Sequence, residues 1–283
     1  MCGPTEIDGY AFCLGIDSLK ELYKAHTGLQ SLIRSVTYLI RGAIFRPNYV
    51  ISKTSGLPQA ICTLGELIDM YHNRKATKLH DKVYALLGMS GMSSDDLSEA
   101  NLSPNYKDDW EQLLQRLAKF LLCDKISVDT WSGKEIAVIQ SKGCILGMIS
   151  SVENIISLDG RQGVDIIFKD ISGQLGYEQE WNAHWTLQPT AKAIRDGDLI
   201  CLLQGVSKPT IIRPRKDYFV IIMIAASPLE NGSTESEYIW RPELFGRDFL
   251  LVWDWKNSLK SQDFGEYNGL VLKNDWVSEY SKI

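Results

Sequence analysis

Three short apolar runs follow one another between residues 196 and 226, and they constrain the fold more than any other stretch. They are rich in β-branched and aromatic residues and cover 199–203, 210–212 and 219–226. Gly205 and Pro209 lie in the first connection, and Pro214 and Asp217 lie in the second. Such runs between turn residues are typical of strands, and short connections favour antiparallel neighbours. The stretch therefore predicts a three-stranded meander, with strands near 198–204, 209–213 and 218–225, at the centre of a β core.

Further β-type runs lie on both sides of this stretch, whereas the first part of the chain has helical spacing. The additional runs are 136–139, 144–149, 164–168 and 248–253. The apolar periodicity predicts helices over 29–45, 63–73, 81–87 and 109–122. Thr63 and Glu66 have the spacing of a capping box, and Gly88 is typical of a helix stop. The polar residues 89–107 indicate a loop.

The helix expected over 109–122 is strongly amphipathic. Its apolar face comprises Leu113, Leu114, Leu117, Phe120 and Leu121. Together these patterns predict an α+β fold in which a helical half, residues 1–125, packs on a mainly antiparallel, β-barrel-like half. That second half covers 126–283 and ends in a weakly patterned tail. Closing the sheet into a barrel would remove its exposed edges.

Composition excludes several classes of protein. Hydrophobic residues make up 45% of the chain and charged residues 23%, as in ordinary globular proteins. The formal net charge of −5 argues against a general nucleic-acid binder, whose affinity depends on neutralising phosphates. No apolar segment is long enough to predict a membrane span or a secretion signal. The six cysteines are widely separated, which favours a reducing compartment, and we expect a cytoplasmic protein.

The sequence contains no motif of a nucleotide, metal or hydrolase site. The patterns GxxxxGK[ST], GxGxxG, GxSxG and HExxH are all missing, and the four histidines are not spaced as metal ligands. We therefore expect neither a cofactor nor a metal.

The densest group of chemically useful side chains lies in residues 178–185. Trp181 and Trp185 share a face whether the segment is a helix or a strand, and His184 lies between them beside carboxylates. A histidine with a pKa near neutrality, next to large rings, suits proton transfer or the orientation of a substrate. The alternative is a surface loop that two tryptophans hold in place.

Three residues elsewhere in the β half complete this candidate site. Tyr218 and Trp253 are expected to line an apolar cavity together with Trp181, His184 and Trp185, and His184 is the catalytic candidate. Arg213 belongs to a basic hairpin tip, which is either a solvated turn or a site for an anionic or carboxylate substrate group.

The run 78–89, KLHDKVYALLGM, resembles the DKVYALLG stretch of fungal heterokaryon-incompatibility (HET) domain proteins. Residues 101–106, NLSPNY, and the later segments GDLICLLQG and PTIIRP are similar to regions that follow that stretch in the family. The ALSYxWG-like and WIDAxCINQ-like segments of the family are not found in residues 1–60. The resemblance therefore covers the rear portion of the family architecture.

Two classes of function remain open from these observations. The first is a cofactor-independent, pericyclase-like cyclase or isomerase that acts on a hydrophobic small molecule in a fungal natural-product pathway. Barrel mouths commonly hold apolar ligands, and the chain is rich in tryptophan and tyrosine. The alternative, which the HET resemblance favours, is a non-catalytic interaction or regulatory module of fungal non-self recognition.

The spacing of the cysteines predicts that all six thiols are free. Titration of the denatured protein with a thiol reagent, without reductant, should find six reactive groups. A stable disulfide would contradict the expected reducing compartment.

Overall fold

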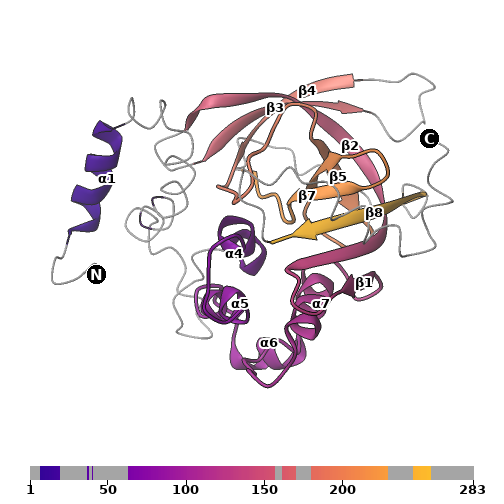
Figure 1. The fold of residues 1–283 in the computed structure, drawn as a ribbon. Coiled ribbons are helices and arrows are strands. Elements are labelled where there is room, and N and C mark those ends of the chain that lie inside the picture. Colours follow the sequence, from indigo (N-terminus) through magenta and orange to yellow (C-terminus); the bar gives the residue numbers. More distant parts are fainter. Residues whose placement is uncertain are drawn as a thin grey trace.

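The long strand β2 (Ile136–Ile156) is the element to which most of the sheet is attached. The computed structural model describes residues 7–19, 37, 40, 63–156, 161–169, 180–228 and 245–255. In Figure 1, β2 is a long curved band around the sheet. It pairs antiparallel with four strands, which are β1 (Ser127–Thr130), β3 (Gln162–Lys169), β5 (Leu199–Leu203) and β8 (Arg247–Asp254).

The other strands extend the sheet from both sides of β2. The order is β4-β3-β2-β5-β6-β7-β8, in which the remaining strands are β4 (Glu180–Leu187), β6 (Thr210–Pro214) and β7 (Phe219–Met223). Every pairing is antiparallel except that of β7 with β8. In addition, β8 pairs with β2, so that β2 has β5 and β8 as well as β3 and β1 as partners. The fold is thus a mixed α+β fold with a large, mostly antiparallel sheet.

The predicted meander is confirmed, but the strand before it differs from expectation. β5, β6 and β7 pair in succession, and Ile212 is opposite both Leu199 and Ile221. The runs 136–139 and 144–149, which were expected to be separate strands, are parts of β2. A Cβ atom at Gly143, between them, would lie 2.7 Å from the Leu202 carbonyl oxygen. This glycine therefore allows strands to approach closely, and it does not mark a turn.

Three of the predicted helices are confirmed. They are α4 (Leu64–Tyr71), α5 (Asp81–Leu87) and α7 (Trp110–Leu121). The capping box of Thr63 and Glu66 is formed as expected. The helix predicted over 29–45 lies outside the described residues, apart from residues 37 and 40. A further helix, α1 (Gly9–Ser18), lies apart from the others in Figure 1.

The loop predicted over 89–107 is wrong in its centre, where a short helix forms. This helix is α6 (Ser94–Glu99), and no residue in it is buried. Its first turn is closed by a capping box between Ser93 and Asp96. The polar composition that predicted a loop thus also supplies the groups that satisfy the first N–H groups of a helix.

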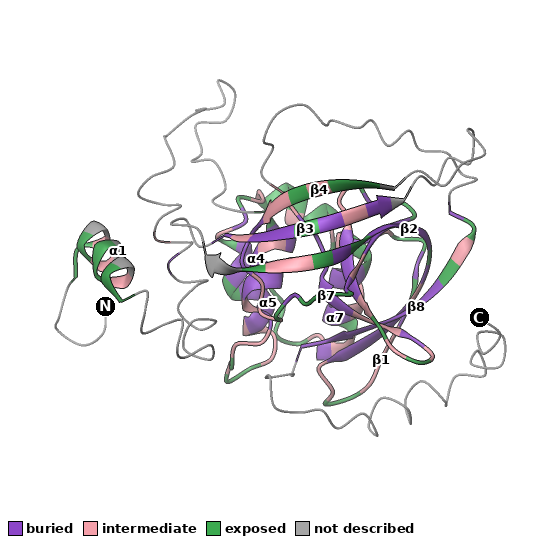
Figure 2. Cartoon of the chain, turned by 90° about the horizontal axis from the view of Figure 1, so that it is seen from above, coloured by how far each residue is buried: buried purple, intermediate pink, exposed green. Residues whose placement is uncertain are grey.

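Helices α4, α5 and α7 share one hydrophobic core with the strands. Leu67, Leu113, Phe249 and Trp253 are each at most 1% exposed and belong to the same cluster. Figure 2 shows β8 buried along most of its length, whereas β4 at the end of the sheet is mainly exposed or half-buried. The helices therefore cover the part of the sheet that contains β8, and β4 remains at its margin.

Two glycines of β2 should be intolerant of a methyl group. At Gly147 a Cβ atom would lie 2.6 Å from the Ile167 carbonyl oxygen, and Gly143 is similarly crowded. We expect Gly143→Ala and Gly147→Ala each to lower the free energy of unfolding by about 1–3 kcal/mol, as overpacking usually does. The measurement is urea-induced unfolding. Gly88→Ala is the control because nothing lies within 4 Å of its Cβ position, and a loss of equal size there would contradict the explanation.

Candidate functional site

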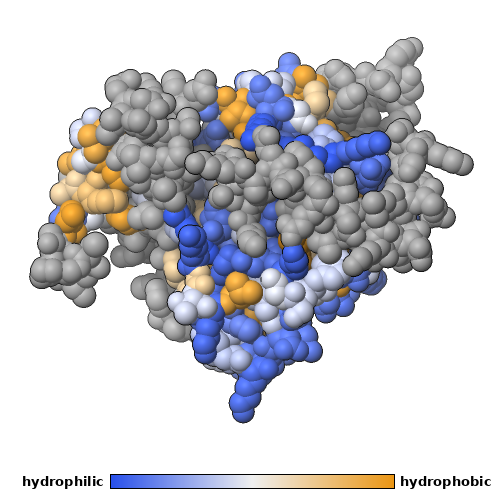
Figure 3. All heavy atoms as spheres, viewed as in Figure 1, coloured by the Kyte–Doolittle hydropathy of each residue, from blue (hydrophilic) through white to orange (hydrophobic). Residues whose placement is uncertain are grey.

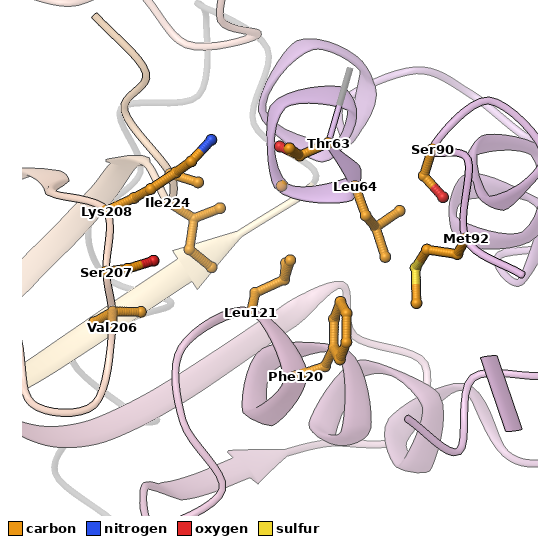
Figure 4. A pocket seen from close by; sticks show the side chains of 12 residues that line it. Thr63, Leu64, Ser90, Met92, Phe120, Leu121, Val206, Ser207, Lys208 and Ile224 are labelled. Carbon is orange, nitrogen blue, oxygen red and sulfur yellow. The ribbon is translucent and has the colours of Figure 1, made fainter. Parts of the chain in front are cut away.

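A pocket of about 320 Å³ lies between the helices and the loop that joins β5 to β6 (Figure 4). The start of α4, the chain after α5, the end of α7, that loop and the chain after β7 all contribute to its wall. Six of the twelve lining residues have larger apolar side chains, and these are Leu64, Met92, Phe120, Leu121, Val206 and Ile224. A volume of this size with mostly apolar walls suits a small organic molecule.

Local features of the sequence bring these walls together. The apolar face of α7 ends with Phe120 and Leu121, and Phe120 remains 41% exposed because it faces the pocket and not the core. The loop from β5 turns at Gly205, whose φ of +92° suits a glycine. A Cβ atom at Gly205 would lie 2.6 Å from the Cys123 sulfur, so the turn packs tightly against the chain after α7.

Polar groups gather where α4 begins. Lys208 is the charged residue among the twelve that line the pocket, and its Nζ donates to the Ser227 hydroxyl over 2.6 Å. Glu66 Oε1 lies 3.7 Å from Lys208 Nζ. Burial alone would raise the pKa of Glu66, but the Thr63 N–H, Lys208 and Ser227 outweigh burial and lower it. Glu66 is therefore ionised at neutral pH.

A buried carboxylate lies directly behind one wall of the pocket. Asp69 of α4 is 0% exposed, and its two oxygens accept hydrogen bonds from the N–H groups of Ile224, at 2.7 Å, and Ala225, at 3.0 Å. These two residues line the pocket. Burial raises the pKa of Asp69 from its ordinary 3.8 to about 7, although both N–H groups and Lys192 oppose the rise. The carboxyl group thus titrates close to neutral pH.

Two further titratable groups belong to this buried centre. The His72 Nδ1–H donates to the Ile68 carbonyl oxygen over 2.8 Å, and burial, with nearby Lys192 and Lys82, lowers the pKa of His72 from 6.5 to about 3. Lys192 donates from Nζ to the Ile221 carbonyl oxygen over 2.8 Å. Burial also lowers the pKa of Lys192, to about 8, against the attraction of Asp254 and Asp69. At neutral pH, His72 is therefore neutral and Lys192 is charged.

The residues singled out in 178–185 lie on β4, on opposite faces of the strand. Trp181 and Trp185 share one face, where both rings contact Phe168 with centroids 5.4 and 5.5 Å away. His184 lies on the outer face, where its Nδ1 is 2.9 Å from Asp165 Oδ1 and its side chain is 44% exposed. The structure therefore brings the two tryptophans together and separates them from the histidine.

The remaining predicted residues occupy other environments. Tyr218 is buried against Leu250 and Val252, whereas Trp253 packs in the main core against Trp255, with ring centroids 5.0 Å apart. Arg213 does bind a carboxylate, but it is that of Asp198, reached from Nε at 2.7 Å and from Nη2 at 2.8 Å. Among the described residues, the candidates thus belong to separate clusters, and on β4 the alternation of a strand sends His184 to the face opposite Trp181 and Trp185.

The residues around the pocket were not recognised from the sequence as a site. Helical periodicity predicts only an apolar helix face for Phe120 and Leu121, and Lys208 lies in a connection between two predicted strands. One signal was present, namely a single carboxylate, Asp69, between the apolar residues Ile68 and Met70 of a short helix. A charge in such a position requires hydrogen-bond donors from another part of the chain.

Metal and membrane sites receive no support from the described part of the chain. It contains no group of three or more His, Cys, Asp or Glu residues arranged to hold a metal ion. None of its helices combines the length and the apolar character needed to cross a bilayer. No protein-family model, curated protein or solved structure matches this chain.

The buried centre predicts an unusual pH dependence of stability. The relevant pH window runs from 3.8 to 6.5, the ordinary pKa values of Asp69 and His72. In this window Asp69 keeps a proton in the folded protein that it loses in the unfolded chain, so its contribution to the free energy of unfolding falls as pH rises. The contribution of His72 rises with pH in the same window, because His72 is protonated in the unfolded chain and neutral in the folded protein. In the native protein the two slopes offset each other.

Removal of either side chain should reveal the pH dependence of stability that the other one causes. We expect the free energy of unfolding of Asp69→Asn to rise with pH more steeply than that of the native protein, by about 1.4 kcal/mol per pH unit. His72→Asn, whose amide can replace the Nδ1–H donor, should deviate by a similar amount in the opposite direction. Urea unfolding at several pH values measures both slopes. Slopes that change in the same direction would contradict the assignment.

Proposed function

We propose that this protein binds a small apolar molecule in the pocket between α4, α7 and the β5–β6 loop. The observation that carries the proposal is the composition of the wall, in which a few hydroxyl groups and one ammonium interrupt an apolar surface. Ligand sites in proteins have this character, with apolar contacts supplying affinity and a few polar groups fixing orientation. The mostly antiparallel sheet, which we take to form a small closed barrel through the β2–β8 pairing, provides a rigid support for one wall.

The catalytic form of this proposal is a cofactor-independent cyclisation or isomerisation. Among the twelve lining residues there is no carboxylate or imidazole, whereas Thr63, Ser90 and Ser207 carry hydroxyl groups and Lys208 an ammonium. Such a wall could accelerate a rearrangement by holding one reactive conformer and donating hydrogen bonds to it. The proposed setting, a natural-product pathway in the fungal cytoplasm, rests on the HET-like residues 78–89 and on the spacing of the cysteines.

The experiment uses N-phenyl-1-naphthylamine, a neutral dye whose fluorescence rises in apolar surroundings. We expect saturable binding that Ser207→Phe and Phe120→Asn each weaken by about tenfold or more, because one substitution fills the pocket and the other removes an apolar wall. Ser207 is exposed and its side chain is directed into the pocket in Figure 4, so the substitution disturbs no buried residue. The readout is a fluorescence titration.

Met148→Asn is the matched control. Met148 and Phe120 are exposed to nearly the same extent, 42% and 41%, but only Phe120 belongs to the pocket wall. Dye affinity should therefore remain unchanged in Met148→Asn. The proposal fails if the dye does not bind, or if the pocket variants bind it as tightly as the native protein does. A compound that displaces the dye and is recovered rearranged would support the catalytic form.

A second candidate, an interaction module, is favoured by a different part of the molecule. Ile7 is 67% exposed, and Leu14 and Leu19 are 51% and 45% exposed on and beside α1. Figure 3 shows apolar side chains gathered on this helix at the left of the molecule. Exposed apolar clusters of this kind are typical of protein–protein contacts. Under this alternative, Leu14→Ser would abolish association with a partner without affecting dye binding.

A further inference from the structure

The charge distribution at the pocket indicates which small molecules it would prefer. We propose that the ligand carries one anionic acceptor group, such as a carboxylate, sulfonate or enolate, attached to an apolar body. This inference rests on the proposed function, because it concerns the same pocket. It adds the chemical class of the ligand and its orientation within the pocket.

Lys208 has hydrogen-bond donors to spare. Its ammonium group carries three N–H bonds, and within the described ranges Ser227 Oγ is the acceptor that lies within hydrogen-bonding distance, at 2.6 Å. Glu66 Oε1, at 3.7 Å, attracts the ammonium but is too far away for a hydrogen bond. The side chain of Lys208 is 38% exposed, so a ligand can reach it. At least one N–H is therefore available to an acceptor in the pocket.

The neighbouring carboxylate does not favour a cationic ligand instead. Glu66 is not among the lining residues, and its side chain is only 14% exposed. Its Oε2 already accepts the Thr63 N–H over 2.8 Å, as part of the capping box. The charge of Glu66 is thus satisfied within the protein, while the charge of Lys208 faces the pocket. The anionic group of a ligand in the pocket would therefore contact the Lys208 ammonium and not the Glu66 carboxylate.

The second polar group at this end of the pocket is the Thr63 hydroxyl. Its Oγ1 accepts the Glu66 N–H, and the same side chain also hydrogen-bonds the Glu66 carboxylate, which lowers the pKa of Glu66. Figure 4 shows Lys208 and Thr63 at one end of the pocket, with Met92 and Phe120 at the other. A bound molecule would therefore direct its anionic group toward Lys208, and its apolar body toward Met92 and Phe120.

The test compares two dyes that share one ring system. 1-Anilinonaphthalene-8-sulfonate is the sulfonated form of the neutral dye described above, so the ratio of their affinities reports the contribution of the anionic group. We expect the native protein to prefer the sulfonate by about three- to tenfold, as for a partly exposed charged hydrogen bond. Lys208→Met should remove the preference, so that the two dyes bind with equal affinity. Added salt should weaken the preference in the native protein.

Two further variants make the result decisive. Lys142→Met removes another half-exposed lysine that is paired with a carboxylate, Asp248 at 3.1 Å, and should leave the preference intact. Glu66→Gln keeps an oxygen for the Thr63 N–H but removes the negative charge, so affinity for the sulfonate should rise about two- to threefold. Because Glu66→Gln predicts a gain, loss of folding cannot imitate it.

The two proposals can fail separately. Equal affinity for both dyes in the native protein, or a preference that survives in Lys208→Met, would overturn the anionic specificity while apolar binding still stands. If neither dye is affected by Ser207→Phe, the pocket is not the binding site and both proposals fall.

Discussion

The contact on which the rest of the structure depends is the pair of hydrogen bonds between Asp69 and the N–H groups of Ile224 and Ala225. These bonds join α4, a helix in the first third of the chain, to the segment that leaves β7, across 155 residues of sequence. Without the carboxylate, two buried N–H groups would lack acceptors, at a cost of about 1–3 kcal/mol each. The orientation of α4 on the sheet, and with it the pocket wall, follows from this contact.

The polar groups of this region fall into two levels with different chemical roles. Asp69, His72 and Lys192 lie inside the fold, and burial shifts their pKa values toward their neutral forms. Lys208 and Glu66 lie nearer the solvent, with Glu66 Oε1 3.7 Å from Lys208 Nζ, and the Thr63 N–H together with Lys208 lowers the pKa of Glu66. The inner level holds the helix on the sheet, while the outer level faces a ligand. Ile224 and Ala225 connect the two levels, since they line the pocket and donate to Asp69.

The sequence predicted local structure better than it predicted the site. The meander and three helices follow from residue periodicity, because each requires only neighbours within a few residues. The continuity of β2 could not be seen, because Gly143 is a turn residue by composition and a close-packing residue by contact. The relative positions of the candidate site residues could not be seen for a related reason. Trp181 and His184 are near in sequence, but strand alternation separates them, whereas Phe120 and Lys208 are far apart in sequence and line the same pocket only after folding.

The long strand β2 also sets an order for folding during synthesis. Its first residue, Ile136, is opposite Asp254, so this pairing joins positions 254 − 136 = 118 residues apart. One edge of β2 therefore stays open until the ribosome has released β8, and α4 has no partner for Asp69 until residue 225 has emerged. Contacts this distant fold slowly and leave strand edges exposed on the nascent chain. The growing polypeptide would thus depend on chaperones, or on rapid translation of its last third, to avoid pairing with other chains.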